Sequence, residues 1–141
     1  MKYIAFDIGD KRIGIAVSDP FCEMALPLET YYRKNLKKDV EYLVDVAKKR
    51  YADVIVCGLP LNFDGSRSVQ TEKTENFIEE LKKSTDIKIV TEDERFTTLE
   101  ARRILIEADM KRQDRKAVID KVAASYILET YMLKQKNKGE L

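Results

Sequence analysis

The chain has 141 residues, a mass of 16.4 kDa and a hydrophobic content of 44%, which predicts a single globular domain spanning residues 1–141. Lys+Arg 26 against Asp+Glu 25 leave a net charge of +1, so any nucleic acid would have to be bound by local basic patches. The absence of histidine excludes Ser-His and Cys-His nucleophiles and the usual histidine-bearing zinc sites. Two cysteines, no signal-peptide pattern and no apolar run near the about 20 residues of a membrane span predict a cytoplasmic protein without a membrane partner.

Three strands are predicted at the start of the chain. The run Tyr3–Ile8 is almost continuously apolar, as in a central strand that is covered on both faces. Gly9–Arg12 supplies a turn, and Ile13–Val17 returns as an antiparallel strand. Leu26–Tyr32 is predicted to be the third strand.

Helices then alternate with strands. Apolar residues recur at helical spacing in Leu36–Tyr51, and Asp53–Gly58 is a short β-branched strand. Ser68 can cap a second helix that runs to about Lys83, and Lys88–Val90 begins a fifth strand.

Two helices are expected after the fifth strand. Thr97–Glu100 has the form of a capping box and predicts a helix that continues through Ala108. The final helix is expected from about Asp114 to about Gln135. Three consecutive strands followed by this alternation predict an α/β fold, with a mixed five-stranded sheet and flanking helices.

Asp7 stands inside the apolar run of the first strand. Burial of an unpaired carboxylate costs several kcal/mol, so Asp7 needs a partner. One interpretation is structural, either an ion pair with Lys11 or Arg12 across the turn or hydrogen bonds to the region of Gly9. The other is a metal ligand, since the end of a central strand holds a side chain rigidly.

Asp120 is the second acid that is predicted to face inward. At helical spacing it shares a face with Ala117, Ala124, Ile127 and Tyr131, so it should point toward the sheet. The alternative is that Asp120 merely lies near the start of the helix, where it interacts favourably with the helix dipole.

The third group of acids is Glu92, Asp93 and Glu94, placed after the fifth strand. In open α/β sheets, ligands collect where strand ends meet the helices that follow them. A solvated acidic loop in which Glu94 pairs with Arg95 is the alternative. Strand alternation does not decide which of the three acids would be a ligand, because loops break it.

Converging acids without histidine suit a hard cation with oxygen ligands, Mg²⁺ or Mn²⁺. Such an ion activates water and neutralises charge on a phosphate. Basic residues that could hold a phosphate backbone occur in the first turn, in the loop before the second helix and around the start of the final helix. They are Lys11, Arg12, Arg67, Lys111, Arg112, Arg115, Lys116 and Lys121.

Four segments, "DIGDKRIGIAVSD", "GLPLNFDG", "DERFTT" and "DKVAA", together resemble the YqgF/RuvX family of bacterial RNase H-like nucleases. They occur in the family's order and span Asp7 to Ala124. The resemblance implies an RNase H-like fold and metal-dependent hydrolysis of phosphodiesters in structured nucleic acid, leaving a 5′-phosphate and a 3′-hydroxyl. The family is associated with maturation of the 5′ end of pre-16S rRNA, and it is also described as resolving Holliday junctions.

The resemblance assigns catalytic and metal-binding roles to Asp7, Glu94 and Asp120, which match the acids of the first strand, of "DER" and of "DKxAA". The resemblance also assigns substrate contacts to the residues that match the family's turn, loop and post-acid positions. These residues are Lys11, Arg12, Asn62 and Arg95, to which the basic stretches add Arg67 and Lys121. Related RuvC-type resolvases carry a further acid where this chain has Ala123, which favours one metal ion over two.

Three other functions compete with an rRNA nuclease that works as a monomer or weak homodimer. A junction resolvase acting on branched DNA needs two opposed active sites and therefore a stable homodimer. A non-catalytic RNA-binding assembly factor would use the acids structurally. "DIGDKRIG" also resembles the phosphate-binding turn of actin-like ATPases, but these need two such domains around the nucleotide.

Overall fold

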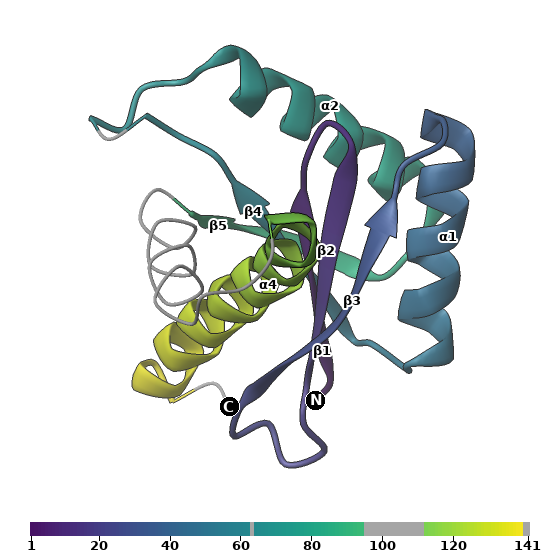
Figure 1. Cartoon of the computed structure of the whole chain (residues 1–141). Helices are drawn as coiled ribbons and strands as arrows, with labels where there is room; N and C mark the ends of the chain where they lie inside the picture. Colours follow the sequence, from purple (N-terminus) through teal and green to yellow (C-terminus); the bar gives the residue numbers. More distant parts are fainter. Residues whose placement is uncertain (63, 95–111, 140–141) are drawn as a thin grey trace.

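The computed structural model describes residues 1–62, 64–94 and 112–139, without the side chains of residues 112–117. Its elements follow in the order β1 (Tyr3–Ile8), β2 (Arg12–Ser18), β3 (Ala25–Tyr32), α1 (Leu36–Lys49), β4 (Val54–Leu59), α2 (Val69–Ser84), β5 (Lys88–Asp93) and α4 (Arg112–Asn137) (Figure 1). None of the described helices combines the length and apolar character that are needed to cross a bilayer.

The five strands form one mixed sheet in the order β3-β2-β1-β4-β5. β1 pairs antiparallel with β2 and parallel with β4, and β5 extends the parallel side. The predicted mixed five-stranded sheet is therefore confirmed, with β1 at its centre.

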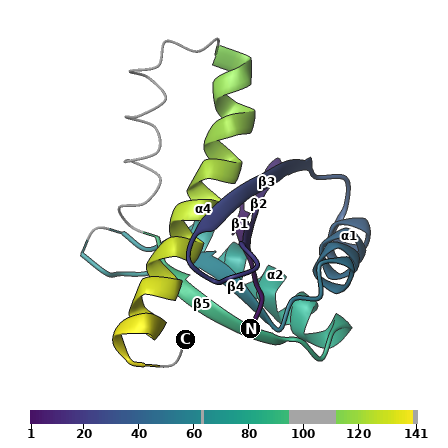
Figure 2. The same ribbon diagram turned by 90° about the horizontal axis from the view of Figure 1, so that it is seen from below.

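Helices cover both faces of the sheet. α1 and α2 lie on one face and α4 on the other (Figure 2). Alternate residues of β1 pack into the two hydrophobic layers. Ile4, Phe6 and Ile8 pack with α1 and α2. Tyr3 and Ala5 face α4. The almost continuous apolar run of β1 follows from this double burial.

The predicted helix starts agree with the capping contacts. Asn35 accepts a hydrogen bond from the Lys38 N–H at 2.9 Å, and Ser68 accepts one from the Thr71 N–H at 3.2 Å. The first helix was predicted to continue to Tyr51 but ends at Lys49, since Tyr51 adopts a left-handed φ of 56°.

The fifth strand is longer than predicted, which corrects the placement of two acids. β5 continues to Asp93 because β4 itself runs to Leu59, and Glu92 and Asp93 pair in register with Gly58 and Leu59. Glu92 and Asp93 are thus strand residues, and only Glu94 follows the strand. The helix predicted from the Thr97 cap lies outside the described residues, and the final helix begins at Arg112 instead of Asp114.

A buried carboxylate fixes the chain between β3 and α1. Asp39 is fully buried and accepts hydrogen bonds at 2.9 Å from the Tyr31 hydroxyl, the Arg33 Nε and the Lys34 N–H. The Arg33 Nη1 also donates to the Gly9 carbonyl at 2.9 Å. Desolvation opposes ionisation of Asp39, but these donors outweigh it and lower the pKa of Asp39. The segment from Tyr31 to Lys34 is therefore tied to both the hairpin turn and α1.

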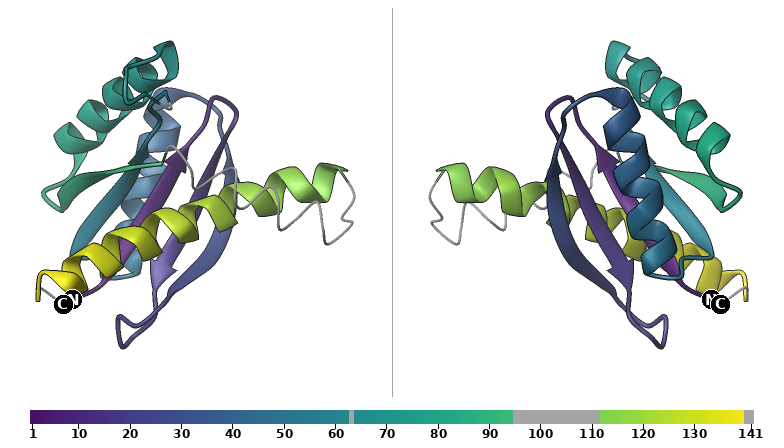
Figure 3. Two further views of the ribbon diagram at one scale, coloured as in Figure 1. Left: turned by 90° about the vertical axis from the view of Figure 1, so that its left-hand side faces the viewer. Right: turned by 90° about the vertical axis from the view of Figure 1, so that its right-hand side faces the viewer.

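Helix α4 crosses the sheet in close contact with β2, and its N-terminal turns project beyond the sheet (Figure 3). A Cβ at Gly14 would lie only 1.8 Å from the backbone oxygen of Asp120. Gly14 is therefore what allows the helix backbone to approach this strand so closely.

Gly14→Ala is expected to destabilise the protein more than Gly58→Ala, by about 3 kcal/mol or more against about 1–2 kcal/mol. At Gly14 the added methyl meets helix backbone, whereas at Gly58 the nearest atoms are the side-chain ends of Glu94 and Ile127, both at 2.5 Å. Urea unfolding followed by circular dichroism measures both changes. Equal stability of Gly14→Ala and the unaltered protein would contradict the close approach.

Candidate active site

Asp7 faces α4, because its neighbours Phe6 and Ile8 both pack into the layer of α1 and α2. In the antiparallel ladder Asp7 stands opposite Gly14, the residue over which α4 passes. The alternation of a central strand thus places a carboxylate between the sheet and the helix. Arg12, one of the ion-pair partners considered for Asp7, is engaged by Asp120.

Glu94 reaches the same face from the end of β5. Its N–H donates to the Leu59 carbonyl at 3.3 Å, which continues the β4–β5 pairing for one more residue. Its carboxylate lies over Gly58, where a Cβ would be 2.5 Å from the Glu94 Oε2. Gly58 therefore makes the space that the carboxylate occupies.

Asp7 and Glu94 form a pair of neighbouring carboxylates. Burial, the charge of Asp7, a hydrogen bond with Asp7 and the charge of Asp93 together raise the pKa of Glu94 to about 10. The Glu94 Oε2 is also buried, and it has no hydrogen-bond partner among the described residues. A buried acceptor without a donor, beside a second carboxylate, is the environment that a cation would stabilise.

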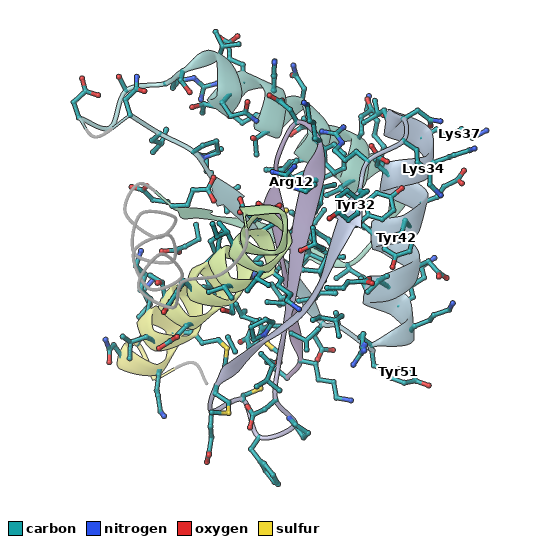
Figure 4. All side chains as sticks on the ribbon, viewed as in Figure 1. Arg12, Tyr32, Lys34, Lys37, Tyr42 and Tyr51 are labelled. Atoms are coloured by element: carbon teal, nitrogen blue, oxygen red, sulfur yellow. The ribbon has the colours of Figure 1, made fainter. Side chains whose placement is uncertain are left out.

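Asp120 arrives at this face from α4, as the helical spacing predicted. Its neighbours on the same helical face, Ala124 and Ile127, are fully buried against the sheet. The Asp120 carboxylate accepts a hydrogen bond at 2.6 Å from the Nε of Arg12 on β2 (Figure 4). Asp120 is thus on the expected face, and Arg12 neutralises it.

The acids on this face of the sheet supply part of the ligand set that a divalent cation needs. Asp7 and Glu94 supply paired oxygen ligands of the kind that Mg²⁺ and Mn²⁺ prefer. Among the described side chains, however, no three acids, cysteines or histidines are grouped closely enough to hold a metal ion. Asp120 would have to leave Arg12 to become a third ligand.

The structure distinguishes Glu94 from its two acidic neighbours. Glu92 is 6% exposed and forms an ion pair with Lys134 of α4, so its carboxylate already has a cationic partner. Asp93 alternates away from the face that Glu92 and Glu94 share, although its charge still contributes to the raised pKa of Glu94. Glu94 is therefore the acid of this segment that lies beside Asp7.

Only some of the predicted substrate-binding residues lie at this site. Arg12 contacts Asp120, and the half-buried Lys121 follows Asp120 on α4. Lys11 is exposed in the hairpin turn, whereas the Asn62 side chain donates to the Ser66 hydroxyl within its own loop at 2.9 Å. Two further predicted residues were Arg67, which forms an ion pair with Glu75 of α2, and Arg95, which lies outside the described residues.

Sequence reasoning missed the two glycines that make room for the site. Gly14 admits the α4 backbone, and Gly58 admits the Glu94 carboxylate. Both interrupt strands of otherwise larger residues, and a glycine inside a strand is a signal of close approach by another group. Because Gly14 alternates with buried isoleucines, its face could also have been predicted.

The strand order and the helices on both faces of the sheet are those of an RNase H-like fold. Solved structures with this arrangement include Thermus thermophilus RuvC in complex with a Holliday junction substrate, with TM-score 0.60, 11% identity, and 99% of this chain and 98% of that chain covered. The Fowlpox virus resolvase in complex with Holliday junction DNA gives TM-score 0.56 and 16% identity, with 95% and 98% covered. At these identities the likeness concerns the fold alone.

The chain belongs to the RuvX family. The family model described as "RuvX: Holliday junction resolvase" matches residues 1–134. A relative from Halothermothrix orenii is 45% identical over 132 residues, which cover 94% of each chain. A relative from Clostridium acetobutylicum is 42% identical over 132 residues, with 94% of this chain and 98% of the relative covered. Both relatives carry the name "Putative pre-16S rRNA nuclease".

Without divalent cations, the stability of the protein is expected to fall as the pH rises from about 5 to about 9. The pKa of Glu94 is about 10 in the folded protein and near 4.5 when unperturbed, so the folded state holds an extra proton in that window and deprotonation favours unfolding. Mg²⁺ or Mn²⁺ should restore stability most at the high end, since protons compete less with the cation for Glu94 at higher pH. Thermal melts across this range test the expectation, with Glu94→Gln predicted to flatten both dependences. A melting temperature of the unaltered protein that rises through this window would contradict it.

Proposed function

We propose that the chain is a divalent-metal-dependent endonuclease for structured RNA, acting at the 5′ end of pre-16S rRNA during ribosome maturation in the cytoplasm. The Asp7–Glu94 pair carries the proposal, because β1 and the end of β5 bring two carboxylates together, and one buried oxygen of Glu94 has no donor within the part of the chain that the structure describes. The names of the curated relatives support this reaction and substrate. Membership of the RuvX family supports nuclease chemistry, whichever nucleic acid is cut. Residues 1–141 would act as one nuclease domain.

In this proposal Asp7 and Glu94 would hold Mg²⁺ or Mn²⁺, and Asp120 would complete the ligand set once released from Arg12. The ion would neutralise charge on the scissile phosphate and lower the pKa of the attacking water. Glu94 must lose its proton when the ion binds, because its pKa of about 10 keeps it protonated at neutral pH.

Arg12 has a second task in the same scheme. Its Nε donates to Asp120, and its side chain remains 27% exposed. A guanidinium carries five N–H donors, so the remaining groups can bind a phosphate oxygen of the substrate. Arg12 would then exchange Asp120 for the phosphate as the metal site fills.

One ion is favoured over two by the packing of α4. Ala123 and Ala124 are fully buried, so the helix presents methyl groups to the sheet one turn after Asp120. Buried methyl groups offer no ligand for a second cation.

Asp7→Asn is expected to reduce Mn²⁺-dependent cleavage of a pre-16S leader RNA by about 100-fold or more, while the thermal stability stays equal or rises. Loss of the Asp7 charge weakens the ligand pair, but it also removes a charge from the desolvated position between the sheet and α4. Asp10→Asn is the matched control, since this acid of the same turn is exposed and pairs with Lys73 of α2. Strong destabilisation would mark Asp7 as a structural residue, and absence of cleavage by the unaltered protein would favour the RNA-binding assembly factor.

The competing function is resolution of four-way DNA, which the description of the family model favours. Resolution by two opposed cuts requires a stable homodimer. We expect the protein to sediment at micromolar concentration as a monomer or weakly associating dimer, and to cut the leader RNA faster than a four-way junction. A stable dimer that makes paired cuts across the junction would overturn the assignment to rRNA.

A further inference from the structure

At the edge of the sheet beside Arg12, the aromatic ring of Tyr32 lies largely outside the hydrophobic core. Tyr32 is 60% exposed at the end of β3, whereas its neighbour Tyr31 is buried and stacks on Tyr42 of α1 with ring centroids 4.3 Å apart. Strand alternation therefore turns Tyr32 to the opposite face of the sheet, the face of α4 and Asp7.

Tyr32 is joined to the candidate active site by the strand register. Arg12 and Tyr32 are direct cross-strand partners, and two residues further along β2 Gly14 stands opposite Asp7. Strand spacings of about 4.8 Å and a rise of about 3.4 Å per residue put the Cα atoms of Tyr32 and Asp7 about 12 Å apart. A nucleic-acid strand held at Asp7 can thus pass over Arg12 and reach Tyr32.

Exposed lysines continue this line beyond the tyrosine. In the view of Figure 4, the labelled residues Arg12, Tyr32, Lys34 and Lys37 follow one another from β2 toward the start of α1, past the edge strand β3 to the side of the sheet that α1 covers. Lys34 and Lys37 are exposed, and neither has an ion-pair partner among the described residues. The nearby acid Asp39 is buried and satisfied by its own donors, so it does not offset their charge at the surface.

We propose that Tyr32, Lys34 and Lys37 bind an unpaired nucleic-acid strand that extends from the cleavage site, with a base stacked on Tyr32 and phosphates at the two lysines. An exposed aromatic ring next to cations is how proteins hold single strands, because every base has a face that stacks while the cations follow the backbone. The surface is also held rigid, since Asp39 anchors Tyr31, Arg33 and the Lys34 backbone on either side of Tyr32. The proposal rests on the proposed function in naming the substrate as one with a single-stranded arm.

Fluorescence anisotropy with a labelled single-stranded RNA, without divalent cations, tests the proposal by binding alone. Tyr32→Ala should weaken binding about five- to 150-fold, and Tyr32→Phe should retain most of it, because stacking needs the ring and not the hydroxyl. Tyr51→Ala is the matched control, since Tyr51 is 76% exposed and lies at the other end of α1 (Figure 4). Blunt duplex RNA should bind Tyr32→Ala and the unaltered protein alike.

The lysines are tested by the salt dependence of the same binding. The plot of the logarithm of the binding constant against the logarithm of the salt concentration has a negative slope. The double change of Lys34→Ala and Lys37→Ala should make this slope shallower by about 1.4 for single strands. Lys48→Ala with Lys49→Ala, at the C-terminal end of α1, is the control pair.

The outcomes separate this proposal from the nuclease itself. If the unaltered protein cleaves RNA but Tyr32→Ala binds single strands as Tyr51→Ala does, the strand surface is wrong and the nuclease stands. If single strands bind through Tyr32 but no cleavage occurs, the surface stands and the nuclease is wrong. Failure of the unaltered protein to bind single strands would overturn the surface and favour a protein partner for Tyr32.

Discussion

The burial of Asp7 and Glu94 side by side is the constraint on which the rest of the site depends. Burial first, and then the charge of Asp7, raise the pKa of Glu94 to about 10, so the two carboxylates cannot both ionise at neutral pH unless a cation joins them. A domain of this size has only about 5–15 kcal/mol of net stability, so such a pair persists only when the surrounding packing holds it. The central strand β1 and the end of β5 supply that packing, because both belong to one continuous sheet.

Helix α4 contributes both to the hydrophobic core and to the candidate active site. Ala124 and Ile127 seal the second hydrophobic layer, and the close approach over Gly14 that this packing requires also brings Asp120 to Arg12. In the absence of metal and substrate, the Arg12–Asp120 ion pair neutralises both side chains, so neither is left as an unpaired, partly buried charge. The fold thus keeps the third acid near the other two without adding to their repulsion.

The sheet and the inward face of Asp120 could be predicted from the sequence because they follow from periodicity. Helical spacing determines where Asp120 points, and that prediction agrees with the structure. The face of Asp7 was not predicted, although alternation in β1 determines it once the helices are assigned to the two faces of the sheet. The extent of β5 could not be predicted in this way, since it depends on how far β4 pairs with it, and Glu92 and Asp93 were therefore misplaced. The pairing of Arg12 with Asp120 across more than 100 positions of sequence was equally beyond local patterns.

A protein with a net charge of +1 must still attract a polyanion, and the arrangement of its charges shows how. Acidic partners neutralise several basic residues away from the α4 face, among them Lys49 and Arg67. Arg12 is paired with an acid that a divalent cation can draw away, while Lys34 and Lys37 lie beside an acid already satisfied in the interior. Binding of a cation would release Arg12 from Asp120 and so add a positive charge beside Tyr32, Lys34 and Lys37. Metal binding and strand binding would then reinforce each other through the same arginine.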